Sequence, residues 1–189
     1  MEEIKKDLLF YEQSGGGVTF SGGEPFFQAA FLLEALEECK GEHINTAVDT
    51  SGYCETDVLA KAAGKANYFL YDIKFMDSAK HEKYCGVPND IILKNLKYLS
   101  AAKTKLLIRI PVIPTINDDM KEMKEIFEFI KDFKNISAVH LLPYHNIQTD
   151  KYKRIGKEYE LHEISGEESP NMNMINSLFA AKFQTKTGG

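Results

Sequence analysis

The stretch that decides the fold reads Gly15-Gly16-Gly17-Val18-Thr19-Phe20-Ser21-Gly22-Gly23-Glu24-Pro25. Its β-prone run, Val18 to Phe20, is followed at once by two glycines, a carboxylate and a proline, which end a strand. The next segment, Phe26 to Lys40, places apolar side chains on one helical face and glutamates on the opposite face. The stretch therefore predicts a strand, a glycine turn and a helix.

The glycine turn has two explanations. Glycines let backbone N–H and C=O groups approach a ligand closely, and Glu24 adds an acceptor suited to an ammonium group. A glycine-rich connection between a strand and a helix, with no ligand, accounts for the same residues equally well, because glycine loops are common. The stretch alone leaves both interpretations open.

Length and charge narrow the class of protein. A chain of 189 residues predicts one domain, 1–189, with its core at about 15–145 and an irregular or helical extension at 146–189. The net charge of −5 gives no electrostatic reason to expect a nucleic-acid partner. No apolar run reaches membrane-spanning length, and the first residues are charged, unlike a signal peptide. We expect no membrane partner.

The cysteines bear on the compartment. Cys39, Cys54 and Cys85 are widely spaced and form no C-x-x-C pair. An odd number at such spacing argues against a secreted disulfide framework and against a self-contained zinc site. The chain is therefore expected in the cytoplasm.

Alternating segments predict the fold class. Strands are expected at Val18–Phe20, Ile44–Val48, Tyr68–Tyr71, Leu106–Ile113 and Ala138–Leu142. Helices are expected at Glu2–Gln13, Phe26–Lys40, Glu55–Ala66, Ser78–Tyr84, Asp90–Lys103, after the cap Asn117-Asp118-Asp119, and at Met172–Ala181. Such alternation predicts an α/β fold with a parallel sheet, and the apolar strands suggest a sheet covered on both faces. A barrel or partial barrel suits single-helix connections at least as well as a doubly wound sheet.

Polar clusters follow the predicted strands at one end. They are Ser21 to Glu24, Asp49 to Ser51, Asp72 with Lys74, Pro111 to Pro114, and Tyr144 to Asn146. In a parallel barrel all strand C-termini lie on one face, where active sites are built. Two carboxylates, a lysine, a histidine and a glycine turn are therefore expected at one mouth.

Each polar residue also has an ordinary explanation. Asp49 suits a turn cap, and Asp72 with Lys74 suits a structural ion pair. His145 suits a surface loop, and Arg109 is more typical of an ion pair inside a barrel than of a ligand contact. Their coincidence at the same end of successive strands favours a joint functional site.

The charges indicate what this site would bind. Glu24 and turn carbonyls suit an ammonium group, and Lys74 or His145 suits a carboxylate. Asp49 and Asp72, if adjacent, would repel each other unless a cation lay between them. The set predicts a ligand with an α-amino acid moiety.

Four motifs together carry a resemblance. Val18 to Pro25, Asp49 to Gly52, Tyr71 to Lys74 and Leu141 to His145 stand in the order and spacing of one family. The chain resembles the activating enzymes of glycyl radical enzymes, within the radical S-adenosylmethionine superfamily, from about Glu2 to at least Tyr159.

The resemblance implies a partial (β/α) barrel, here with its first strand missing. It further implies an oxidoreductase in which a [4Fe–4S] cluster cleaves S-adenosylmethionine to a radical. That radical takes hydrogen from a glycine of a partner enzyme, such as pyruvate formate-lyase or a relative. A flavodoxin-type reductant would supply electrons.

The resemblance also implies residue roles. The methionine amino group would be held by Ser21, Gly22, Gly23 and Glu24. Lys74 and His145 would line the S-adenosylmethionine pocket. A monovalent cation would be bound by Asp49, Thr50 and Asp72 with the Leu70 carbonyl.

One departure limits these expectations. The family carries C-x3-C-x2-C upstream of the glycine motif, and no cysteine precedes Gly15 here. Because Cys39, Cys54 and Cys85 cannot replace that triplet, they are expected to be structural thiols. The chain is expected to be a C-terminal fragment that is inactive alone.

Two alternatives remain. The chain could be a non-radical module that binds S-adenosylmethionine or an amino acid. It could instead be a Schiff-base lyase or aldolase-type barrel, with Lys74 as nucleophile and His145 as acid and base.

Overall fold

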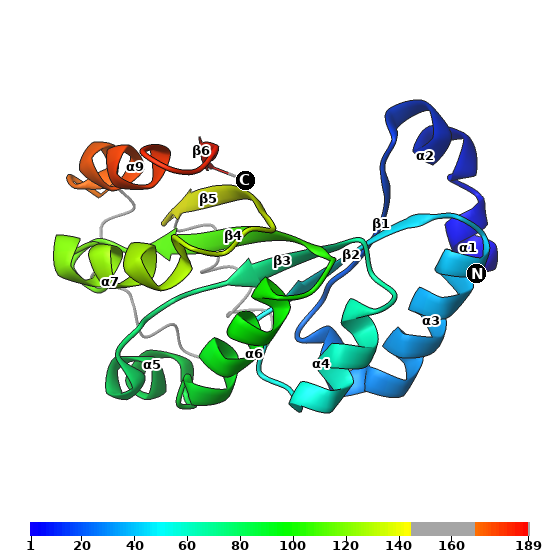
Figure 1. The fold of residues 1–189 in the computed structure, drawn as a ribbon, viewed down its shortest axis with the longest axis horizontal. Helices are drawn as coiled ribbons and strands as arrows, with labels where there is room; N and C mark the ends of the chain where they lie inside the picture. The colour runs from blue at the N-terminus through cyan, green and yellow to red at the C-terminus, as the bar shows by residue number, and fades with distance from the viewer. Residues whose placement is uncertain (145–168, 189) are drawn as a thin grey trace, which may run out of the picture.

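The protein is built on one parallel sheet (Figure 1). The computed structural model describes residues 1–144 and 169–188. Within them, six strands pair in the order in which they occur along the chain. They are β1 (Gly17–Phe20), β2 (Asn45–Thr50), β3 (Tyr68–Asp72), β4 (Lys105–Val112), β5 (Ile136–Pro143) and β6 (Thr185–Thr187). A doubly wound sheet would reverse its strand order, so the sequential order confirms the partial barrel.

Helices α1 (Glu2–Lys5) and α2 (Leu8–Ser14) precede the first strand. The helices that follow the strands cover one side of the sheet (Figure 1). They are the 3-10 turn η1 (Pro25–Gln28), α3 (Ala29–Gly41), α4 (Thr56–Ala63), α5 (Ser78–Cys85), α6 (Asp90–Ser100), α7 (Met120–Ile130) and α9 (Met172–Ala180). Neighbouring helices α3, α4 and α6 contact one another in that order. The apolar side of each of these helices therefore packs against both the sheet and the neighbouring helix.

The two faces of the sheet differ in burial. Alternate strand residues are fully buried on the helix side, for example Val48, Tyr71 and Ile108. The residues between them, such as Asp49 and Asp72, are only half-buried. Because side chains alternate across a strand, these polar residues share the inner face of the partial barrel. The expectation of a sheet fully covered on both faces is wrong for the described residues.

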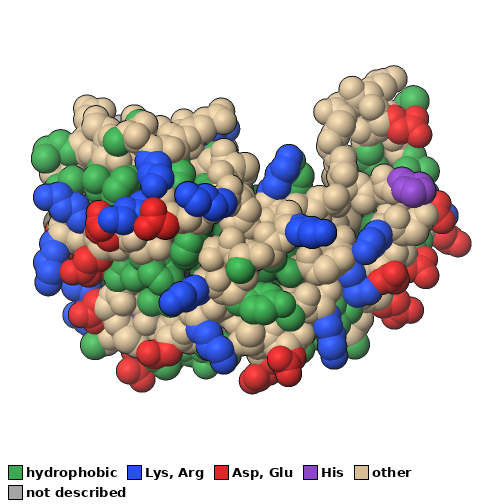
Figure 2. Space-filling model, viewed as in Figure 1, with side chains coloured by type: hydrophobic (Ala, Val, Ile, Leu, Met, Phe, Trp, Pro, Cys, Tyr) green, Lys and Arg blue, Asp and Glu red, His purple; other side chains and the backbone are tan. Residues whose placement is uncertain are grey.

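The N-terminal helix differs from its prediction. The expected helix Glu2–Gln13 is divided into α1 and α2 at Lys6 and Asp7. No residue of α2 is buried, and Leu9 and Phe10 are 61% and 64% exposed. Figures 1 and 2 show α2 standing away from the body, whereas α1 lies beside the end of α3, where Lys5 pairs with Glu42. Ile4, Leu8 and Tyr11 are half-buried on one side of the segment, so α1 and α2 pack on the body only through this side.

The two edges of the sheet are short strands. β1 has one neighbour among the described strands and lies at one edge, with β6 at the other. β6 was not predicted, because Thr185-Lys186-Thr187 has no apolar side chain to signal a strand. Its place is fixed by pairing with Val139 to Leu141 of β5. The helix before it, α9, confirms the helix expected at Met172–Ala181.

No helix in the described part of the chain combines the length and the apolar character that a membrane crossing requires.

Candidate functional site

The loops after the first three strands meet at the carboxyl edge of the sheet. Hydrogen bonds join the turn after β1 to the end of β2 at two places, from Ser21 to Asp49 and from the Thr50 hydroxyl to Glu24. Arg109 of β4 reaches both Asp49 and Asp72. The prediction that these strand ends converge is confirmed for the described residues.

Glu24 connects the first two loops. One of its oxygens accepts from the Thr50 hydroxyl at 2.7 Å and from the Phe26 N–H at 3.2 Å. The other accepts from the Ser51 N–H at 2.9 Å and from the Ser51 hydroxyl at 2.6 Å. A carboxylate has about four acceptor positions, so these four donors use the capacity of Glu24. Its first role is therefore to fix the turn after β1 onto β2.

The turn itself is open. Gly22 has φ 131°, in the region that favours glycine, and no atom lies within 4 Å of where a Cβ would stand at Gly22 or Gly23. The backbone of this turn is thus accessible from the solvent side, as a cradle for a ligand group requires.

Asp49 and Asp72 do have a cation between them, and it is Arg109. The guanidinium donates to both oxygens of Asp49, from Nη1 to Oδ2 at 3.0 Å and from Nη2 to Oδ1. Its Nε donates to Asp72 Oδ1 at 2.8 Å. The three side chains are 19–22% exposed. Arg109 is an ion-pair residue on the inner face of the partial barrel, and the expected pair between Asp72 and Lys74 is not among the described salt bridges.

The pKa shifts follow from burial and from these pairs. Burial raises the pKa of Asp72, and the charges of Arg109 and Lys74 offset only part of that effect. Burial lowers the pKa of Arg109, but Asp72 and Asp49 more than compensate and hold it above its ordinary value. The cluster therefore keeps a charged guanidinium at its centre.

Beside the cluster lies a cavity of about 230 Å³. Its polar lining includes Glu24, Ser51, Asp72 and Lys74, and the aromatic ring of Phe27 stands at its side. Pockets for drug-sized ligands hold about 300–1,000 Å³, so this cavity suits one end of a larger ligand. The Lys74 ammonium forms no hydrogen bond or ion pair with another described residue, and remains available for an anion.

Buried amides hold the cavity walls. Asn117 donates to the carbonyls of Lys74 and Pro111, and accepts from the Ile113 N–H at 2.7 Å. Asn95 donates to the carbonyls of Gly52 and Cys54. The expected cap Asn117-Asp118-Asp119 is confirmed at Asp119, which accepts from the N–H groups of residues 121 and 122, whereas Asn117 serves the cavity wall. The partners of both amides lie far away along the chain, so no local sequence pattern predicts them.

Comparison with known proteins identifies the family. The sequence profile of the Radical SAM superfamily matches residues 1–130, more than half of the chain. The chain belongs to the radical SAM superfamily.

The most informative radical SAM relatives are activating enzymes. The chain is 46% identical over 193 residues to the trans-4-hydroxy-L-proline dehydratase activating enzyme of Clostridioides difficile, covering 100% of this chain and 64% of that protein. It is 42% identical over 164 residues to the choline trimethylamine-lyase activating enzyme of Oleidesulfovibrio alaskensis, covering 85% of this chain and 53% of that protein. The chain thus spans between about half and two thirds of the length of these relatives.

A solved structure agrees. A domain of a pyruvate-formate lyase-activating enzyme from Bacteroides vulgatus superposes with a TM-score of 0.77 at 30% identity, covering 92% of this chain and 99% of that one. The resemblance to glycyl-radical-enzyme activating enzymes is confirmed by these relatives.

The described residues do not fit an iron–sulfur cluster. Cys39 is fully buried on the core side of α3, while Cys54 and Cys85 are half-buried in other segments. Burial, then Glu24 and Glu55, raise the pKa of Cys54 to about 12, which disfavours a thiolate ligand. In residues 1–144 and 169–188, no group of three Cys, His, Asp or Glu side chains could hold a metal.

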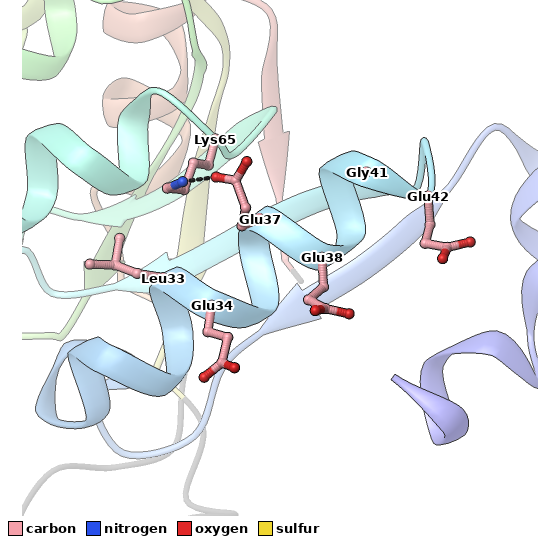
Figure 3. A pocket seen from close by; sticks show the side chains of 7 residues that line it. All are labelled: Leu33, Glu34, Glu37, Glu38, Gly41, Glu42 and Lys65. Carbon is pink, nitrogen blue, oxygen red and sulfur yellow. Dashed lines mark ion pairs between the residues drawn. The ribbon is translucent and has the colours of Figure 1, made fainter.

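A second hollow lies elsewhere on this radical SAM domain. It is an open groove along α3, lined by Leu33, Glu34, Glu37, Glu38, Gly41, Glu42 and Lys65 (Figure 3). Glu37 pairs with Lys65 and Glu42 pairs with Lys5, while Glu34 and Glu38 point outward without converging. Although it is larger than the cavity at the strand ends, it brings no set of complementary groups together.

Two predicted site residues, His145 and Thr50, are not among the described side chains that line the cavity. His145 lies outside the described residues. Thr50 is buried, and its hydroxyl donates to Glu24. Because adjacent residues of a strand face opposite ways, the Thr50 side chain lies on the other face of β2 from Asp49. Ser51, which was not singled out in its own right, supplies two of the four hydrogen bonds to Glu24.

Proposed function

We propose that this chain binds the methionine end of S-adenosylmethionine at the carboxyl edge of its sheet, as part of an activating enzyme for a glycyl radical enzyme. The observation that supports it best is the cavity in which Lys74, without a described partner, faces Glu24, Ser51 and Asp72. An α-amino acid carries both an ammonium and a carboxylate, and this lining offers a counter-charge for each.

The residue roles follow from this proposal. The open turn of Ser21, Gly22, Gly23 and Glu24 would hold the amino group, chiefly through backbone carbonyls, since Glu24 already accepts four hydrogen bonds. Lys74 would pair with the carboxylate of the ligand. His145 is proposed to contact the ligand beside Lys74. Asn117 would keep Lys74 in place through its hydrogen bond to the Lys74 carbonyl.

A bound positive charge is part of the proposal. When Arg109 leaves them, Asp49 and Asp72 would share a monovalent cation, with the Leu70 carbonyl beside them; Leu70 is in register with Asp49. Thr50, named with them by resemblance, would act indirectly through Glu24.

We further propose the partner class and the compartment. Relatives are named for activating a dehydratase and a lyase, which makes a glycyl radical enzyme of that kind the partner. Pyruvate formate-lyase is one candidate, because a solved relative carries its name. A flavodoxin-type reductant and a cytoplasmic location fit oxygen-sensitive chemistry with free thiols.

The function is tested by anaerobic iron–sulfur reconstitution. This chain is compared with a version extended by the part of the C. difficile relative that it does not match. Each is mixed with S-adenosylmethionine, reductant and a candidate partner, and electron paramagnetic resonance is recorded. We expect a cluster signal and a glycyl radical from the extended version alone.

Other results would change the account. A radical generated by this chain alone would contradict the finding that its described residues do not fit a cluster. S-adenosylmethionine binding with no radical from the extended version would favour the non-radical binding module. Neither binding nor radical would contradict the proposed function.

A further inference from the structure

The two aspartates of the proposed cation site are already bridged inside the protein. Asp49 and Asp72 stand on neighbouring strands and face the same side of the sheet, with Leu70 of β3 in register with Asp49. Both carboxylates lie close to Arg109, which is in register with Asp72 on the next strand. The side chain of Arg109 therefore reaches across β3 to the second aspartate.

The contact geometry is that of a specific ion pair. Arg109 offers two parallel N–H groups to the two oxygens of Asp49, while its Nε donates to Asp72. A planar guanidinium can make this arrangement and a lysine ammonium cannot, because only the guanidinium carries a rigid fork of donors. Ser21 adds a hydrogen bond to Asp49 Oδ2 at 3.3 Å.

The charge balance is as informative as the geometry. Two carboxylates face one guanidinium, and the nearby Lys74 also acts on Asp72. A second cation entering between the aspartates would compete with Arg109 for the carboxylate oxygens that the guanidinium already contacts, in a half-buried setting where like charges repel strongly. A solution cation and the guanidinium therefore exclude each other.

We propose that Arg109 is the resident monovalent cation of this site in the ligand-free protein, and that it keeps alkali ions out of the space between Asp49 and Asp72. The inference rests on the proposed function only in taking these aspartates as its cation site. An alkali ion enters when Arg109 leaves the pair, or when the arginine is removed by mutation.

Thermal unfolding tests this directly. Melting temperatures of this chain and of Arg109→Gln are measured in sodium, potassium, rubidium and tetramethylammonium chloride at equal ionic strength. We expect the wild-type Tm to be the same in all four salts. In tetramethylammonium chloride we expect Arg109→Gln to have a lower Tm than the wild type. In at least one alkali salt we expect the Tm of Arg109→Gln to rise saturably by about 2–4 °C above its value in tetramethylammonium chloride, because a ligand that binds only the native state stabilises it.

Two controls locate the effect. Adding Asp49→Asn to Arg109→Gln removes one carboxylate, and we expect the alkali dependence to disappear. Lys182→Gln removes a cation from an exposed ion pair with Asp132, where no second carboxylate converges, and we expect no dependence on the alkali ion.

Defined results overturn the proposal. A wild-type Tm that rises in one alkali salt shows an ion bound alongside Arg109. An Arg109→Gln variant that folds but responds equally to all four salts shows that the aspartates do not form a cation site. If that variant fails to fold, sodium-23 NMR line broadening on the wild type remains decisive, because selective binding of sodium at this site contradicts exclusion.

These measurements contain neither S-adenosylmethionine nor a cluster. Failure of the proposed function would therefore leave the salt dependence unchanged, and failure of the cation exchange would leave S-adenosylmethionine binding to be judged separately.

Discussion

At the scale of single residues, Gly52 is held by two constraints. Its φ is 76°, and a Cβ there would overlap the hydroxyl of Tyr71, a buried ring that donates to the Ile92 carbonyl at 2.7 Å. We expect Gly52→Ala to lower the free energy of unfolding by roughly 2–4 kcal/mol, from left-handed backbone strain plus overpacking. Urea unfolding measures the change.

Gly41→Ala is the matched control. Gly41 has no positive φ, and no atom lies within 4 Å of the added methyl group. We expect it to be neutral or stabilising by about 0.5–1 kcal/mol, because Gly41 ends helix α3. Equal effects of the two substitutions would contradict the role given to Tyr71.

Glu24 gives the second residue-scale prediction. It accepts four hydrogen bonds that join the turn after β1 to β2. Glu24→Gln keeps the shape but turns an NH2 group toward donors, so we expect a loss of about 1–3 kcal/mol in unfolding free energy. Glu34→Gln, on the exposed groove of α3, controls for the lost charge (Figure 3). The account is wrong if urea midpoints of the two variants coincide.

At the scale of elements, the inner face of the sheet makes stability depend on pH. His140 of β5 lies between Arg109 of β4 and Lys186 of β6 in the strand register. Burial lowers the pKa of His140 below 6.5, and Lys186 and Arg109 lower it further. As the pH falls through about 6.5, the unfolded chain takes up a proton that the native state resists, so stability is lost on acidification.

We therefore expect His140→Gln to weaken this acid-side loss. The urea midpoints of the wild type and of His140→Gln are measured at pH ~7.5 and at pH ~5.5, the range over which an unperturbed histidine titrates. The control is His43→Asn, which removes an exposed histidine and introduces a residue that tolerates the φ of 57° found there. A His140→Gln variant with the same pH dependence as wild type would show that the neighbouring cations do not act on this ring.

At the scale of the whole molecule, the sequence was sufficient for the architecture. Alternating apolar segments and turn residues located five strands of the sheet within about two residues. Motif order supplied the family, which a single glycine turn could not have done. β6 escaped prediction because its three residues are polar and owe their conformation to pairing with β5.

The site was predicted less completely, for a physical reason. Polar residues after each strand could be listed from sequence because parallel strands end on one side. Which of them pair depends on how far each side chain reaches across the strands, and for this reason Asp72 pairs with Arg109 of the next strand and not with Lys74. The contacts of Asn95 and Asn117 connect segments far apart in the chain and left no local pattern.

We propose that the strand-end cavity of this chain binds the amino acid end of S-adenosylmethionine. Isothermal titration calorimetry with S-adenosylmethionine measures this binding on the wild type, on Lys74→Met and on Lys97→Met, whose exposed side chain lies on α6 away from the cavity. We predict that Lys74→Met weakens binding about 10-fold or more, the loss of one charged contact, while Lys97→Met binds as wild type. Equal affinities of the wild type and Lys74→Met, or no binding by the wild type, would contradict the account.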